Sequence, residues 1–190
     1  MATYPGSETI DLQYSFTISN KAYVGSGRNG DTNVTLSDFW EYNPTLNAWT
    51  RVDDFPFEYI PGLPNFKISH NNKAYIFPSL NNNRISPVFE YNPETNEWAQ
   101  ITDYVEDSSV STQITEGLIG LVLNKFQNYM YRLDIDNKRW VKIKTPDFNG
   151  NAGSTGIIVN NKIYILRDKF YGGDGEGKEL WEYTPPPVTK

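Results

Sequence analysis

The sequence predicts an all-β fold made of about four copies of one four-stranded antiparallel unit. The motif Tyr-Asn-Pro-x-x-Asn-x-Trp occurs at residues 42–49 and 91–98, with a weaker copy at residues 133–140 and a partial one at residues 180–185. A second recurring element, with the pattern of a β-hairpin, precedes the motif. Aromatic residues make up 15% of the chain, and 14 glycines and 12 prolines supply turns, which suits many short strands. A repeat of this length indicates an array of one supersecondary unit.

The hairpin element supplies the first two strands of each unit. It occurs at residues 16–24, 66–77 and 156–166 as an apolar run, a polar turn with Asn and Lys, and a second apolar run. Asparagine tolerates the positive φ that tight hairpin turns need, so we expect two strands joined by a short turn. The third unit is less regular, and we expect its strands near residues 111–115 and 117–123.

The motif supplies the last two strands of each unit. The third strand carries an aromatic residue and a glutamate (Glu41 or Glu90) before the motif's tyrosine, and the tryptophan begins the fourth strand. Between these strands Asn-Pro-x-x-Asn forms the turn, because Pro presets φ and Asn caps the turn. One four-stranded sheet cannot bury both faces, so neighbouring units must stack. We expect Trp49, Trp98 and Trp140 to pack between units.

The seven-residue distance from tyrosine to tryptophan and the Asn/Lys/Tyr hairpin resemble the kelch repeat over nearly the whole chain. The resemblance implies a β-propeller in which each four-stranded unit is a blade. The paired glycines of the family are kept loosely, as Gly25-Ser26-Gly27. Within one domain of residues 1–190, the four blades are expected at residues 15–52, 66–102, 111–143 and 154–190.

The phase of the repeat leaves one outer strand of a four-blade ring unassigned. Residues 10–18 alternate apolar and polar side chains over nine positions, and we expect residues 8–14 to pair with the fourth blade and close the ring. The alternatives are a part of a larger propeller and a half-ring that forms a homodimer.

Composition excludes several classes of function. The net charge is −6 with no basic stripe, so nucleic acid is not an expected partner. No apolar run reaches the roughly 18–20 residues of a membrane helix, so membrane insertion is not expected. The N-terminal residues do not have the pattern of a signal peptide. Earlier removal of a signal peptide is the alternative, and it would be consistent with an extracytoplasmic location.

The chain also offers few residues for metal or nucleophilic chemistry. It has one histidine and no cysteine, so we expect no catalytic triad, no metal site and no cofactor. The adjacent acids Asp53-Asp54 and Glu106-Asp107 keep a glycan-acting enzyme as an alternative, because glycoside hydrolysis uses paired carboxyl groups.

Binding is expected on the face that carries the connections between the second and third strands and between successive units. These connections are longer and more variable than the other turns, which is typical of functional loops on a rigid scaffold. Aromatic, arginine and amide side chains on this face are typical of a protein interface. The expected binding residues are Arg28, Asn29, Phe57, Tyr59, Asn81, Arg84, Tyr104, Lys169, Phe170 and Tyr171. For Phe57 the alternative is that its ring fills the propeller. We therefore expect a non-enzymatic module that binds a protein partner, with carbohydrate recognition as the alternative.

Overall fold

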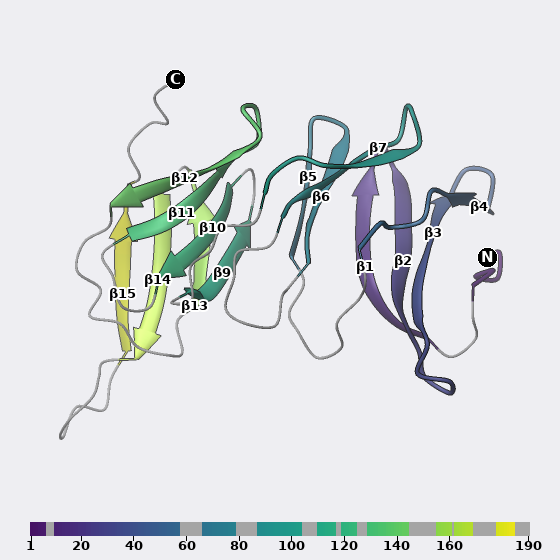
Figure 1. Cartoon of the computed structure of the whole chain (residues 1–190), viewed down its shortest axis with the longest axis horizontal. Helices are drawn as coiled ribbons and strands as arrows, with labels where there is room; N and C mark the ends of the chain where they lie inside the picture. Colours follow the sequence, from purple (N-terminus) through teal and green to yellow (C-terminus); the bar gives the residue numbers. More distant parts are fainter. Residues whose placement is uncertain are drawn as a thin grey trace. The chain divides into compact units, whose positions relative to one another are not determined.

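The all-β prediction is confirmed by a computed structural model of the chain, in which fifteen strands and no helix lie within the described residues (Figure 1). The structure describes residues 1–6, 10–57, 66–78, 87–103, 110–116, 119–124, 129–144, 155–160, 162–168 and 178–184.

The strands form four antiparallel sheets, each a meander in chain order. The first sheet contains β1 (Ile10–Ile18), β2 (Lys21–Asn29), β3 (Thr35–Asn43) and β4 (Ala48–Val52). The second contains β5 (Phe66–His70), β6 (Lys73–Phe77), β7 (Phe89–Asn92) and β8 (Glu97–Gln100). The third contains β9 (Val110–Glu116), β10 (Ile119–Asn124), β11 (Tyr129–Asp134) and β12 (Arg139–Lys144). The fourth contains β13 (Thr155–Val159), β14 (Lys162–Asp168) and β15 (Lys178–Tyr183). The first two sheets form one compact unit and the last two another.

The hairpin turns between first and second strands have the predicted conformation. β1 and β2 are joined by Ser19 and Asn20, whose φ angles are 48° and 61°, and β5 and β6 by Asn71 and Asn72, at 48° and 59°. Two successive residues with positive φ make a type I′ turn, which matches the twist of the flanking strands. Asparagine is favoured here because its short polar side chain tolerates this conformation.

The predicted Asn-Pro-x-x-Asn turn uses its two asparagines differently. In the first sheet the Asn43 carboxamide oxygen accepts hydrogen bonds from the backbone N–H groups of Thr45 and Leu46, at 3.0 and 3.2 Å. Asn47, at the end of the turn, takes a positive φ of 49°. The first asparagine therefore caps the turn, and the second permits its left-handed step.

The strand register explains the seven-residue distance from tyrosine to tryptophan. Tyr42 lies directly opposite Trp49 in the β3–β4 pair, and Tyr91 lies opposite Trp98 in the β7–β8 pair. Their ring centroids are 4.9 and 4.8 Å apart. Four turn residues separate the two strands, so the spacing places each aromatic pair across the turn, where it stabilises the hairpin.

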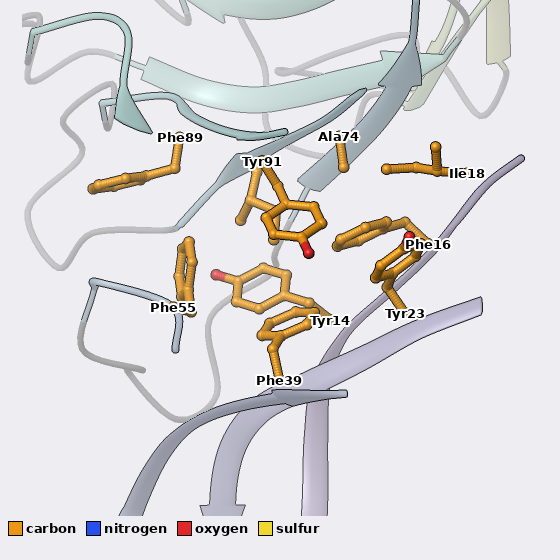
Figure 2. Packing of buried hydrophobic residues seen from close by; sticks show 10 residues of the cluster. Tyr14, Phe16, Ile18, Tyr23, Phe39, Phe55, Ala74, Phe89 and Tyr91 are labelled. Carbon is orange, nitrogen blue, oxygen red and sulfur yellow. The ribbon is translucent and has the colours of Figure 1, made fainter. Parts of the chain in front are cut away.

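The core of the first compact unit is a cluster of aromatic side chains contributed by both of its sheets (Figure 2). Phe16 of β1 stacks on Tyr23 and Phe39 of the same sheet, with ring centroids 5.2 and 5.7 Å away, and its ring lies 6.2 Å from Tyr91 of the second sheet. Trp98 packs against this cluster, as predicted for the motif tryptophans. The first two sheets therefore bury one face of each against the other.

The second compact unit has an aliphatic core in its described part. Leu133 of β11, Ile143 of β12, and Ile163 and Ile165 of β14 are buried. β9 and β13 contact each other, so the two sheets of this unit also meet. The third sheet follows the predicted pattern, with strands that differ from the expected 111–115 and 117–123 by one to two residues at each end.

The N-terminal strand extends along its own sheet. Ile10 to Tyr14 continue β1, and the register pairs Ile10 with Asn29 and Tyr14 with Gly25 of β2. In the described residues the fourth sheet has three strands, as the phase of the repeat indicates. Closure of a ring by residues 8–14 stays a prediction.

A β-bulge interrupts the pairing of β2 with β3 between Gly25 and Gly27. Ser26, between them, has a φ of 54° and is buried, and its hydroxyl has no hydrogen-bond partner among the described residues. A residue with a Cβ is strained at this φ, and a buried hydroxyl without a partner costs further free energy.

Replacing Ser26 by glycine should therefore raise the free energy of unfolding of the first unit by about 1 kcal/mol, after the larger unfolded-state entropy of glycine is subtracted. Denaturant unfolding followed by tryptophan fluorescence measures the change. Ser26→Ala, which removes the hydroxyl but keeps the strained φ, should gain less. A loss of stability in the glycine variant would contradict this reading of the bulge.

Candidate functional site

Each sheet has two distinct ends because its strands form a meander. We call turn end the one with the turns between first and second and between third and fourth strands. We call loop end the one with the connection between second and third strands and the links to neighbouring sheets. Three predicted binding residues lie at the loop end of the first compact unit, namely Arg28, Asn29 and Phe57. The other seven lie outside the described residues, namely Tyr59, Asn81, Arg84, Tyr104, Lys169, Phe170 and Tyr171.

Asn29 shapes the loop between β2 and β3. Its carboxamide oxygen accepts hydrogen bonds from the backbone N–H groups of Asp31 and Thr32, at 3.0 and 2.9 Å. Its backbone N–H donates to the Val34 carbonyl at 2.9 Å, and its carbonyl accepts from the Asn33 N–H at the same distance. The side-chain oxygen of Asn29 is therefore engaged within the loop, and its contribution to binding would come through loop shape.

Arg28 and Phe57 are also engaged within the first unit. The Arg28 guanidinium forms an ion pair with Asp11 of β1, with Nη2 3.3 Å from Oδ2. The Phe57 ring is partly buried and packs against the core, with its centroid 5.5 Å from that of Phe89. The structure does not bring these two side chains into a shared contact among those described.

The adjacent acids Asp53 and Asp54 serve different neighbours. The Asp54 carboxylate pairs with the Arg51 guanidinium at 2.8 and 3.1 Å. Asp53 contacts the second sheet, where its backbone N–H donates to Asn96 Oδ1 at 3.1 Å. The two carboxyl groups therefore have separate partners, and no described contact joins them as the paired acids of glycoside hydrolysis. Glu106 and Asp107 lie outside the described residues.

The two ends of the first sheet each expose one large apolar side chain. Val34, in the loop between β2 and β3, is 57% exposed at the loop end. Leu46, in the turn between β3 and β4, is 71% exposed at the turn end. These residues give a matched pair of positions for comparing the two ends.

A lysine–tyrosine–glutamate network recurs across the second and third strands, and sequence analysis did not identify it. In the first sheet Glu41 accepts from Lys21 Nζ at 2.8 Å and from the Tyr23 hydroxyl at 2.7 Å. In the fourth sheet Glu182 accepts from Lys162 at 2.6 Å and from Tyr164 at 2.7 Å. In the second sheet Lys73 donates to Glu90 at 2.9 Å, and Tyr75 lies opposite Glu90 in the register.

The signal for this network was present in the sequence. Each of these sheets carries Lys-x-Tyr immediately after the hairpin turn and a glutamate just before the motif tyrosine. Antiparallel register places Tyr23 opposite Glu41 and Tyr164 opposite Glu182. A carboxylate that accepts from both a lysine and a phenol is satisfied and fixed, so the network aligns two strands.

Three tyrosines of the first unit should titrate at high pH. Burial, with the negative charges of Glu41 and Asp53, raises the pKa of Tyr91 to about 12. Burial and the charge of Asp38 raise the pKa of Tyr4 to about 12. Burial, followed by the hydrogen bond to Glu41, raises the pKa of Tyr23.

Because these phenols ionise at pH 10.0 in an ordinary environment, the stability they contribute is fully present below pH 10.0. It is lost as the pH rises toward 12, since the unfolded chain loses these protons first. We expect the unfolding midpoint to fall between pH 10.0 and about 12. In the folded protein, phenolate absorbance should appear at a higher pH than in the unfolded chain. Tyr91→Phe should flatten the fall. Native phenolates already formed near pH 10.0 at all tyrosines would contradict the prediction.

Within the ranges that the structure describes, no group of three or more His, Cys, Asp or Glu side chains is arranged to hold a metal ion. In the same part of the chain, no helix has the length and apolar character needed to cross a bilayer.

Comparison with known proteins gives a structural likeness. No family model matches the sequence, and no curated protein matches it. A solved structure described as "Structure of YjhT" matches with a TM-score of 0.57 and 16% sequence identity. The match covers 88% of this chain and 62% of that chain, so this chain spans less than two thirds of its length. At this identity the likeness concerns the backbone fold alone.

Proposed function

We propose that the chain is a kelch-like β-propeller of four blades that acts as a non-enzymatic interaction module and binds a protein partner through its loop end. The kelch-like repeat supports the propeller, since three of the four sheets have four strands in meander order and the motif residues pair as a repeat requires. Stacked repeats of this kind bury a continuous core and present their connections along one side.

The observation that carries the binding proposal is the contrast between the two ends of the first sheet. Its turn end is closed by a two-residue turn and by a four-residue turn that Asn43 caps. Its loop end carries the connection between β2 and β3, which exposes Val34 beside the ion pair of Arg28 with Asp11. Arginine is enriched at protein interfaces, and here it lies in the same connection as an exposed apolar side chain.

The test compares the two ends with matched substitutions. Val34→Asp alters the loop end and Leu46→Asp alters the turn end, and both exposed positions should leave the free energy of unfolding within about 0.5 kcal/mol of wild type. The immobilised chain is exposed to extract from its source cells, and bound proteins are identified by mass spectrometry. We expect a partner that wild type and Leu46→Asp retain and that Val34→Asp loses.

A partner lost equally with both substitutions, or with neither, would argue against the loop end of the first sheet. A parallel thermal-shift screen against glycans addresses the alternative function. A saccharide present at 100 times its dissociation constant adds about 2.7 kcal/mol of stability. A shift of that size with a defined sugar would replace the protein-binding proposal with carbohydrate recognition.

A further inference from the structure

The tryptophan and the last asparagine of the motif together hold a segment of extended backbone. In the second sheet, Asn96 Oδ1 accepts the backbone N–H of Asp53 at 3.1 Å, and Trp98 Nε1 donates to the Asp53 carbonyl at 3.0 Å. One residue of the passing segment is thus fixed through both its donor and its acceptor. We call Asn96 and Trp98 the Asn–Trp slot of the second sheet.

The first sheet has the same slot, and the N-terminal segment fills it. Asn47 Oδ1 accepts the backbone N–H of Ala2 at 2.7 Å, and Trp49 Nε1 donates to the Ala2 carbonyl at 3.2 Å. The atoms and their roles are those of the second sheet. The held residue is alanine in the first slot and aspartate in the second. Each slot therefore binds the backbone of this residue and does not select its side chain.

Two residues further along, each segment places an aromatic ring against the slot tryptophan. The Tyr4 ring lies 5.2 Å from Trp49 at an interplanar angle of 81°, and the Phe55 ring lies 4.9 Å from Trp98 at 68°. A proline follows each of these aromatic residues. The two occupants, Ala-Thr-Tyr-Pro and Asp-Asp-Phe-Pro, therefore share an aromatic–proline pair at the same distance from the held residue.

The walls of the slot are fixed by the sheet itself. The Tyr42 hydroxyl donates to Asn47 Oδ1 at 2.8 Å, and the Tyr91 hydroxyl donates to Asn96 Oδ1 at 3.0 Å. A carboxamide oxygen can accept two hydrogen bonds, so the tyrosine orients it and the second site serves the passing backbone. A rigid site loses little conformational freedom on binding, which favours affinity for a short peptide.

We propose that the Asn–Trp slot of the first sheet (Asn47 and Trp49) is a recognition site for an extended aromatic–proline segment of a partner protein. In this structure the chain's own residues 2–5 fill the slot as a built-in ligand. The fit of residues 2–5 to the slot is incomplete, because the Tyr4 hydroxyl is buried and has no hydrogen-bond partner among the described residues. A peptide of another protein that carries phenylalanine at this position can therefore compete in the first slot. This site lies at the turn end and does not rest on the loop-end function proposed above.

The aromatic position should prefer phenylalanine to tyrosine. The Tyr4 hydroxyl is buried and has no hydrogen-bond partner among the described residues. Phenylalanine occupies the equivalent position in the second slot. A buried hydroxyl without a partner weakens binding relative to its absence, so a partner peptide with Phe-Pro should bind more tightly than one with Tyr-Pro.

The experiment uses the full chain with its internal ligand weakened. Ala2→Pro removes the backbone N–H that donates to Asn47, because proline has none. Tyr4→Ala removes the ring that contacts Trp49. Neither substitution changes the slot walls. The probe is a fluorescent, N-acetylated peptide of sequence Ala-Thr-Phe-Pro-Gly, and fluorescence anisotropy measures its dissociation constant.

We expect both variants to bind the probe about tenfold or more tightly than wild type, since the loss of one competing interaction of this kind corresponds to about that factor. Asn47→Ala in the Ala2→Pro background should abolish the gain. A control peptide with the order Pro-Phe should not compete. Circular dichroism verifies that each variant is folded. If either Ala2→Pro or Tyr4→Ala does not fold, the other still tests the proposal.

Three outcomes would overturn the proposal. The first is no saturable binding to either folded variant, and the second is equal binding of the control peptide. The third is dimerisation of the variants that is lost when Trp49 is replaced. That result would mean that the slot binds the N-terminal segment of a second copy of the chain. Since none of these assays involves Val34, they can fail while the loop-end function holds.

Discussion

Replacing Phe55 by alanine should lower the free energy of unfolding of the first compact unit by about 3–5 kcal/mol. Phe55 lies in the connector after β4, yet it is only 2% exposed. Its ring is 4.9 Å from Trp98, 5.2 Å from Tyr14 and 5.4 Å from Phe89. It thus contacts both sheets, and alanine would leave a cavity where they meet (Figure 2).

Denaturant unfolding monitored by tryptophan fluorescence measures this loss. Phe57→Ala is the matched control, because it removes the same ring two residues away from a partly buried position. It should cost less than half as much. Phe55→Leu keeps part of the buried volume and should fall between wild type and Phe55→Ala, which gives a measurable value if the alanine variant does not fold. Equal losses for Phe55→Ala and Phe57→Ala would show that Phe55 does not join the two sheets.

The repeated parts of the fold could be predicted from the sequence because their signals are local. The type I′ turns require two residues of positive φ, and the sequence places Ser19-Asn20 and Asn71-Asn72 there. The turn of the motif is specified by Asn43 and Asn47 within five residues. In such elements the residues that determine the conformation are also the residues that adopt it, so no tertiary information is needed.

The connectors could not be predicted in this way because they have no periodicity. Phe57 was predicted to bind a partner, with filling of the propeller as the alternative, and its partly buried ring packs on the core of the first unit. Its role in binding stays a prediction. Asn29 was predicted to bind a partner, which stays a prediction, and the oxygen of its side chain caps its own loop. Polarity and aromatic character are the same in a binding residue and in a loop-forming one, so only the surrounding contacts distinguish them.

The lysine–tyrosine–glutamate network lies between these two cases. Its residues recur at fixed positions of the repeat. Tyr23 and Glu41, however, are 18 residues apart in the sequence, and only the strand register brings them together. The third sheet shows how the repeat varies, because Leu121 pairs there with Arg132 at the equivalent register position. An apolar residue and an arginine cannot form this network, which explains why the third unit resembles the others least.

Replacing Gly25 by alanine should destabilise the first sheet by about 3 kcal/mol, at the upper end of the cost of overpacking. Gly25 lies in β2 between Tyr14 of β1 and Phe39 of β3. A Cβ atom there would clash with the Asp38 carbonyl oxygen and would lie 2.6 Å from the Phe39 Cα. Both are backbone atoms of the neighbouring strand, so a side-chain rotation cannot relieve the contact. β2 and β3 would have to separate next to the bulge.

The substitution at the neighbouring residue, Ser26→Gly, should change the free energy of unfolding in the opposite direction. Ser26→Gly relieves a strained φ and removes a buried hydroxyl that has no partner among the described residues, whereas Gly25→Ala introduces a backbone contact. Two adjacent positions of one strand should therefore shift the unfolding midpoint in opposite directions. Thr17→Ala, at an exposed position of β1, should change the free energy of unfolding by no more than about 0.5 kcal/mol. If Gly25→Ala changed the free energy of unfolding as little as Thr17→Ala, the close approach of β3 to Gly25 would be contradicted.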